Sequence, residues 1–85
     1  MYTKGILTRY ADGLEQSGRT IDAADFRSAL SRITFEIANG VEVCMGGAVS
    51  DVLEGTSIEC LIADLAQRWH EFATPEDLKS QEEVV

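Results

Sequence analysis

The side chains with the widest use in catalysis are few in this sequence: one histidine, His70, and two cysteines, Cys44 and Cys60. A general base needs a nucleophile or an orienting carboxylate within hydrogen-bond reach, and on a helix the neighbouring Glu71 would not face His70. A zinc site needs four ligands, or three and a water molecule, and the spacing here brings no such set together. Gly46-Gly47 lacks the flanking pattern of a phosphate-binding loop and is interpreted as a turn or a close helix crossing. We therefore expect a non-enzymatic protein with no catalytic residue, no metal and no cofactor.

Carboxylates are the chemically active groups that this sequence supplies in number. It holds 15 Asp and Glu against seven Lys and Arg, which gives a net charge of −8 over 85 residues. Residues 1–40 carry five basic and five acidic side chains, so the whole excess belongs to residues 41–85, with ten acidic and two basic side chains. A directed negative field of this kind steers a basic partner and repels a phosphate backbone. The carboxylates that we expect to bind the partner are Glu59, Asp64, Glu71, Glu76 and Asp77.

Two of these carboxylates, Asp64 and Glu71, are seven residues apart and therefore share one face of a helix. A fixed row of carboxylates can imitate spaced phosphates or complement a basic groove. The plainer interpretation is a solvated face on which Asp64 pairs with Arg68, four residues later. A negative surface can also serve solubility alone. The sequence leaves these interpretations open.

Glycines and one proline divide the chain into four longer segments and a short fifth, and each longer segment carries apolar residues at helical spacing. This pattern predicts an all-α fold, a small compact bundle of four helices plus a short fifth. The domain covers residues 1–79, and residues 80–85 form a frayed acidic tail. The clearest helix runs from Ser57 to Phe72, with Thr56 and Glu59 as a capping-box pair. The other helices are expected at about residues 3–17, 20–37 and 41–52 and from Pro75, and the expected core includes Leu65 and Trp69.

Residues 33–45 also fit a β-hairpin, because apolar residues alternate on both sides of Asn39-Gly40: Ile33, Phe35 and Ile37, then Val41, Val43 and Met45. A three-residue loop, 38–40, would place both sets on one face, with Gly40 at the left-handed position of a bulged turn. We favour the helix, because its apolar stripe runs unbroken from Ala23 to Ile37. In the helix, Phe35 would lie exposed opposite the stripe and mark a contact surface. In the hairpin, Phe35 would be part of the core.

These features favour a small protein-interaction module that blocks a basic, nucleic-acid-binding protein surface, as an inhibitor or immunity-type protein does. The expected partner is a basic protein, with no direct nucleic-acid binding and no membrane contact. A structural or regulatory homodimer with Phe35 in its seam is the alternative, and a small carrier or enzyme is a second one. No apolar stretch approaches the ~20 residues of a spanning helix, and no secretion signal is evident. We therefore expect a cytoplasmic protein.

Overall fold

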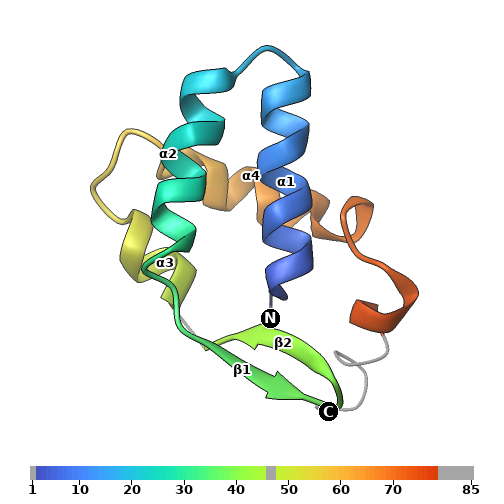
Figure 1. Ribbon diagram of the computed structural model, residues 1–85. Coiled ribbons are helices and arrows are strands. Elements are labelled where there is room, and N and C mark those ends of the chain that lie inside the picture. Colours follow the sequence, from blue (N-terminus) through green and yellow to red (C-terminus); the bar gives the residue numbers. More distant parts are fainter. Residues whose placement is uncertain (1, 46–47, 79–85) are drawn as a thin grey trace.

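The computed structural model describes residues 2–45 and 48–78, so that Gly46-Gly47 and the tail at 80–85 lie outside the described residues. More than half of the described residues are helical, and the remainder includes one small antiparallel sheet (Figure 1). Residues 75–78 add one further helical turn. The elements are, in order, α1 (Lys4–Gln16), α2 (Thr20–Leu30), β1 (Phe35–Ala38), β2 (Val41–Cys44), α3 (Ala48–Leu53), α4 (Cys60–Arg68) and the 3₁₀ turn η1 (Trp69–Glu71).

Helix α1 agrees with the helix expected at about residues 3–17 to within one residue at each end. The Thr3 side chain caps it by accepting a hydrogen bond from the Ile6 amide at 3.1 Å. Gly18, with φ of 90°, takes the left-handed conformation that follows such a helix. Helix α2 then runs back antiparallel beside α1, and α4 crosses the pair (Figure 1). The core side chains that α1 and α2 contribute are Ile6, Leu7, Tyr10, Ala11, Leu14, Ala23, Phe26 and Ala29.

The expected helix over residues 33–45 is wrong, and the alternative hairpin is found in its place. Asn39 and Gly40 both have positive φ, 53° and 80°, as the type I′ turn of a two-residue hairpin loop requires. Ala38 therefore pairs with Val41, and the loop is one residue shorter than the bulged turn considered above. This register places Phe35 opposite Cys44 and Ile37 opposite Glu42. The two alternating sets consequently face opposite sides, and Ile37 is 76% exposed.

Strand β2 joins the hairpin to the start of α1. Thr3 forms a single antiparallel bridge with Val43, and the Cys44 amide donates to the Tyr2 carbonyl oxygen at 2.6 Å. In Figure 1, β2 lies between β1 and the N-terminal end of α1, so that β1 is the outer strand. The expected helix over residues 41–52 is thus divided into strand β2 and the short helix α3.

Helix α4 is shorter than the expected helix from Ser57 to Phe72, because it begins at Cys60 and continues beyond Arg68 only as a 3₁₀ turn. The expected capping box does not form. The Thr56 hydroxyl donates to the Leu53 carbonyl oxygen at 2.7 Å, and the Glu59 carboxylate accepts from the Gly55 amide at 3.0 Å.

The core prediction for this segment is confirmed at Leu65, which is fully buried, while Trp69 is half-buried against the core. Leu61 and Ile58 join Leu65 in the same buried cluster as α1 and α2. Among the helices of the described residues, none has the length and apolar character needed to cross a membrane.

Candidate functional site

The expected acidic row, Asp64 on α4 and Glu71 on η1, is paired with one arginine of this molecule. The Arg68 guanidinium lies 3.2 Å from the Asp64 carboxylate and 3.2 Å from the Glu71 carboxylate. It also lies over the Phe72 ring, 5.5 Å from the centroid, which is within the range of a cation–π contact. The structure therefore shows the pairing of Asp64 with Arg68 that the plainer interpretation foresaw, and Glu71 shares the same arginine.

Asp64 has a second, structural contact. It accepts a hydrogen bond from the Tyr10 hydroxyl at 2.6 Å, which ties α4 to α1. Burial, together with this hydrogen bond, raises the pKa of Tyr10 well above its ordinary value, so that Tyr10 stays a donor. Asp64 consequently holds the fold together as well as carrying charge, and a partner would have to compete with both Tyr10 and Arg68 for its carboxylate.

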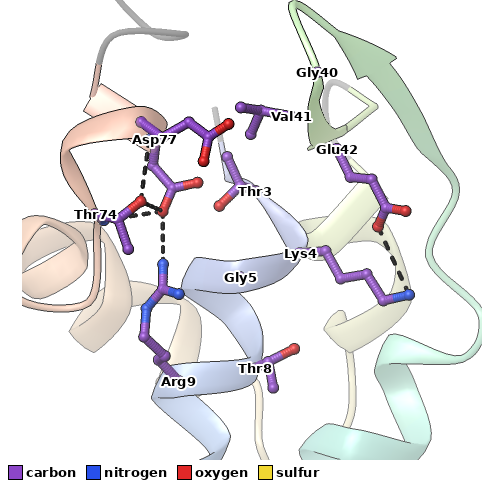
Figure 2. Close-up of a pocket in the computed structure, with 11 residues that line it drawn as sticks. Thr3, Lys4, Gly5, Thr8, Arg9, Gly40, Val41, Glu42, Thr74 and Asp77 are labelled. Carbon is purple, nitrogen blue, oxygen red and sulfur yellow. Dashed lines mark hydrogen bonds and ion pairs between the residues drawn. The ribbon is translucent and has the colours of Figure 1, made fainter.

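Asp77 lies inside the molecule, although it was expected to bind a partner. Its side chain is 7% exposed and meets the Arg9 guanidinium at 2.6 Å (Figure 2). It also accepts hydrogen bonds from the Thr74 amide at 3.0 Å and the Thr74 hydroxyl at 2.9 Å, while its own amide donates to that hydroxyl oxygen at 3.3 Å. Thr74 and Asp77 thus form the reciprocal cap of the helical turn that begins at Pro75.

The hydrogen bonds to Asp77 outweigh the effect of its burial. Burial alone would raise the pKa of this carboxyl group. Hydrogen bonds from Thr74 and Thr3, together with the Arg9 charge, lower the pKa of Asp77 below its ordinary value. Arg9 is itself held from two sides, because its Nε also donates to the Phe72 carbonyl oxygen. Asp77 is therefore a buried, ionised group whose contacts with Arg9 and Thr74 stabilise the fold.

A cleft of about 470 Å³ opens beside this pair, between the start of α1, the hairpin and the turn at Thr74 (Figure 2). Its charged lining is mostly self-paired, because Lys4 lies 3.6 Å from Glu42 and Arg9 meets Asp77. Glu76 also lines it and has no ion-pair partner among the described residues. Glu76 is thus the one expected partner-binding residue on this side that stays exposed and unpaired within residues 2–45 and 48–78.

A second groove, of about 400 Å³, lies between α3 and α4 and has a different character. Ile62, Ala63 and Ala66 give it an apolar wall, and the Glu54 and Glu59 carboxylates stand beside them. Glu59 is exposed, as expected, and its hydrogen bond from Gly55 limits its rotamers. This groove combines apolar surface with two carboxylates, Glu54 and Glu59, that have no ion-pair partner among the described residues.

Sequence reasoning named Glu59 but missed Glu54 and Asp51, which are exposed and likewise have no cationic partner within the described part of the chain. A signal for them was present. No Lys or Arg occurs between Arg32 and Arg68, a stretch that holds six carboxylates. A count of bases along the chain would therefore have located the uncompensated charge better than helical periodicity did.

The expected exposure of Phe35 is also corrected. In strand β1 the ring is half-buried and packs against the main core cluster, because the strand turns it toward the side of Cys44. The contact-surface argument required Phe35 to lie opposite an apolar helical stripe, and that helix does not exist. Phe35 is therefore a supporting residue of the hairpin, and the large apolar side chain left in solvent on the same strand is Ile37.

The residues considered for catalysis are dispersed. His70 is exposed and stacks edge-on against the Trp69 ring, with centroids 5.1 Å apart. Cys44 is buried, which raises the pKa of its thiol, and Cys60 is an exposed free thiol. Within the described ranges, no three His, Cys, Asp or Glu side chains gather in a way that would hold a metal ion.

Comparisons with protein-family models, with curated proteins and with solved structures find no match for this chain. A functional inference consequently depends on the residues themselves. The arrangement offers two kinds of surface, a charge-paired cleft at the start of α1 and an acidic, partly apolar groove between α3 and α4.

Proposed function

We propose that this protein is a small, acidic, non-enzymatic interaction module that binds a basic protein through the α3–α4 groove and blocks that partner's basic surface. The observation that supports this proposal is the base-free stretch from residue 33 to residue 67. Within it, Asp51, Glu54 and Glu59 are exposed and have no cationic partner among the described residues. Their charge is therefore available to a cation from another molecule.

The groove offers the two contributions that a protein interface combines. Its carboxylates steer a basic surface toward it and raise the association rate, an effect that salt weakens. Ile62, Ala63 and Ala66 offer apolar area, whose burial supplies affinity that salt does not remove. The small alanine side chains also allow close approach of a partner backbone. An amphipathic, basic helix suits this combination, with its apolar face toward Ile62 and its Lys or Arg beside Glu54 and Glu59.

The same charge opposes direct binding to nucleic acid. Affinity for a phosphate backbone comes from Lys and Arg that neutralise phosphates. The described bases are largely committed to carboxylates of this chain, as with Arg9 to Asp77 and Arg68 to Asp64. If the partner itself binds nucleic acid, the module would compete with that nucleic acid for the partner's basic surface.

A model-peptide titration tests this proposal. The probe is an amphipathic helical peptide with Leu on one face and Lys on the other, and the readouts are calorimetry and backbone amide shifts at low and high salt. We expect binding that weakens with salt and shifts amides of α3 and α4. Glu54→Lys with Glu59→Lys should abolish most of it. Asp25→Lys, which reverses an exposed acid on α2, is the matched control for the single variant Glu54→Lys and should weaken binding only slightly.

The result that would overturn the proposal is equal weakening by Glu54→Lys and Asp25→Lys, because binding would then follow net charge alone. Unchanged affinity in the double variant would have the same consequence and would leave the negative charge with a role in solubility. Glu71→Lys separates the groove from the Arg68 cluster, because Glu71 lies outside the groove lining. We expect that variant to resemble the control.

A further inference from the structure

Strand β1 has an outer edge that nothing in the described structure covers. The sheet has two strands, and the far edge of β2 already meets Tyr2 and Thr3 at the start of α1. No described residue pairs with the other edge of β1, which lies at the outside of the fold (Figure 1). An uncovered strand edge is a template for pairing with another chain, and proteins usually protect it.

The register shows which backbone groups point outward. Met45 donates its amide hydrogen to the Thr34 carbonyl oxygen at 3.1 Å, across the hairpin. Backbone groups alternate in direction along a strand, so Thr34, Glu36 and Ala38 direct theirs toward β2. Phe35 and Ile37 therefore direct their amide and carbonyl groups outward, and neither residue has a hydrogen-bond partner for them among the described residues.

The side chains along this edge alternate in chemistry. Ile37 is 76% exposed, and Phe35 is half-buried on the same side of the sheet. Glu36 points to the opposite side, is exposed and has no ion-pair partner within the described part of the chain. Phe35–Ala38 contains no Lys, Pro or bulge, so its only protecting devices are its length of four residues and the charge of Glu36. The edge thus presents an apolar, acidic, apolar sequence together with free backbone groups.

We propose that this edge binds an extended segment of a protein partner as an added antiparallel strand, and that the segment carries the pattern apolar–Lys/Arg–apolar. Residues opposite each other in paired strands share a face. The basic side chain would therefore stand opposite Glu36, at a non-hydrogen-bonded pair where side chains approach most closely. The two apolar side chains would cover Phe35 and Ile37. This surface is separate from the α3–α4 groove, and the inference does not depend on it.

Charge decides in favour of such a segment over a second copy of this chain. Two copies paired about Glu36 would set two carboxylates opposite each other, which is unfavourable. Two copies paired about Ile37 would be joined through strands of four residues each. That contact falls well below the roughly 800 Å² per partner of a standard stable interface. A basic segment avoids the repulsion at Glu36 and gains an ion pair there; its contact along the four-residue edge is equally short, so its binding is weak and transient.

The test uses the full chain, isotopically labelled, and the end-capped peptide Thr-Val-Lys-Val-Thr, with Thr-Val-Glu-Val-Thr as its charge-reversed control. We expect the lysine peptide to shift the amides of Phe35 and Ile37 and to slow their hydrogen exchange. The glutamate peptide should bind about fivefold more weakly, in line with the modest energies of cross-strand pairs. Exchanging the charges through Glu36→Lys should reverse this preference between the two peptides.

Two variants of one residue separate backbone pairing from loss of side-chain area. Ile37→Pro removes the outward amide but none of the hydrogen bonds to β2, so the hairpin keeps its ladder. Ile37→Thr retains the amide and a β-branched side chain. We expect Ile37→Pro to abolish binding and Ile37→Thr to weaken it by a few fold. Equal affinity in both variants, or peptide-induced shifts confined to α3 and α4, would overturn the proposal. Self-association of the free protein that Ile37→Pro abolishes would also overturn it, in favour of a second copy.

Discussion

Two regions of this molecule treat their carboxylates in opposite ways. Between α1 and α2, Arg27 reaches Asp12 at 2.6 Å and Glu15 at 3.3 Å, so that two acids of one helix are held by a base of the next. Around α3 and the start of α4, no base is near in the sequence, and Glu54 and Glu59 stand uncompensated among the described residues. Similar exposed side chains therefore do different things, because one set is already paired and the other is not.

The difference shows that net charge alone is a poor guide to a binding surface. Asp64 and Glu71 belong to the acidic half of the chain, yet both are paired with Arg68, and Asp64 also accepts a hydrogen bond from Tyr10. The charge that can act on a partner is the charge left after internal pairing. By that measure, the acidic surface lies toward α3 and away from the C-terminal end of α4.

The largest expected change in stability concerns the core on which both regions pack. Leu65 of α4 is fully buried in the cluster that includes α1 and α2. We expect Leu65→Ala to lower the free energy of unfolding by about 2–5 kcal/mol, because it removes buried contacts and leaves a cavity. Chemical denaturation measures this loss, and Ile37→Ala at an exposed site should cost far less. A loss below about 0.5 kcal/mol would show that the two regions are not packed on one core.

A smaller effect is expected at Asp77. Asp77→Asn removes a buried charge held by Arg9 and Thr74 and should lower the free energy of unfolding at neutral pH by about 1–3 kcal/mol. The pKa of Asp77 is lowered on folding, so its contribution is present above the unfolded pKa of about 3.9 and is lost as pH falls through the folded value.

The difference in free energy of unfolding between the wild type and Asp77→Asn should therefore become smaller below about pH 4. Urea unfolding across a pH series measures it, and Glu76→Gln at the exposed neighbour is the control. If the difference in free energy of unfolding stays constant down to low pH, the ionised carboxylate of Asp77 makes no contribution to stability through its charge.

The smallest expected changes in stability come from two variants, one in each region, that compare paired with unpaired carboxylates. Asp12→Asn removes a partner of Arg27 and should lower thermal stability, whereas Glu54→Gln relieves repulsion among unpaired carboxylates and should raise it. Both changes fall within the small range that surface substitutions usually produce. Added salt should shrink both differences, because it screens exposed charges. The same sign for both variants would mean that the pairing contrast has no energetic consequence.

The helical regions of the fold were predictable because their signals are local. The apolar stripe of α1 and the glycine that follows it, Gly18, indicate one helix without help from distant residues. The hairpin was less certain, since the apolar spacing from Ala23 to Ile37 also fits a helix. What decides between them is the Asn39-Gly40 turn and the Tyr2–Thr3 backbone that pairs with β2, and this pairing is a long-range contact.

The candidate site was predictable only in part, for the same reason. Glu59 keeps the exposed position that its sequence suggested, and the pairing of Asp64 with Arg68 is a local event four residues apart. The burial of Asp77 depends on Arg9, and no spacing rule connects residues so distant along the chain. Helical periodicity predicts the face of the helix on which a side chain lies, but it does not predict which distant residues pack against that face.

The bond between Arg9 and Asp77 also bears on the order in which the molecule assembles. Its two residues are separated by 68 positions, so it closes a loop that contains nearly every other element. Loop closure over such a distance costs entropy before the contact returns any stability, and contacts of this kind slow folding. The antiparallel α1–α2 pair needs only neighbours in the chain and can form early. During synthesis, Arg9 on α1 therefore remains solvated until residue 77 has been made and can pair with it.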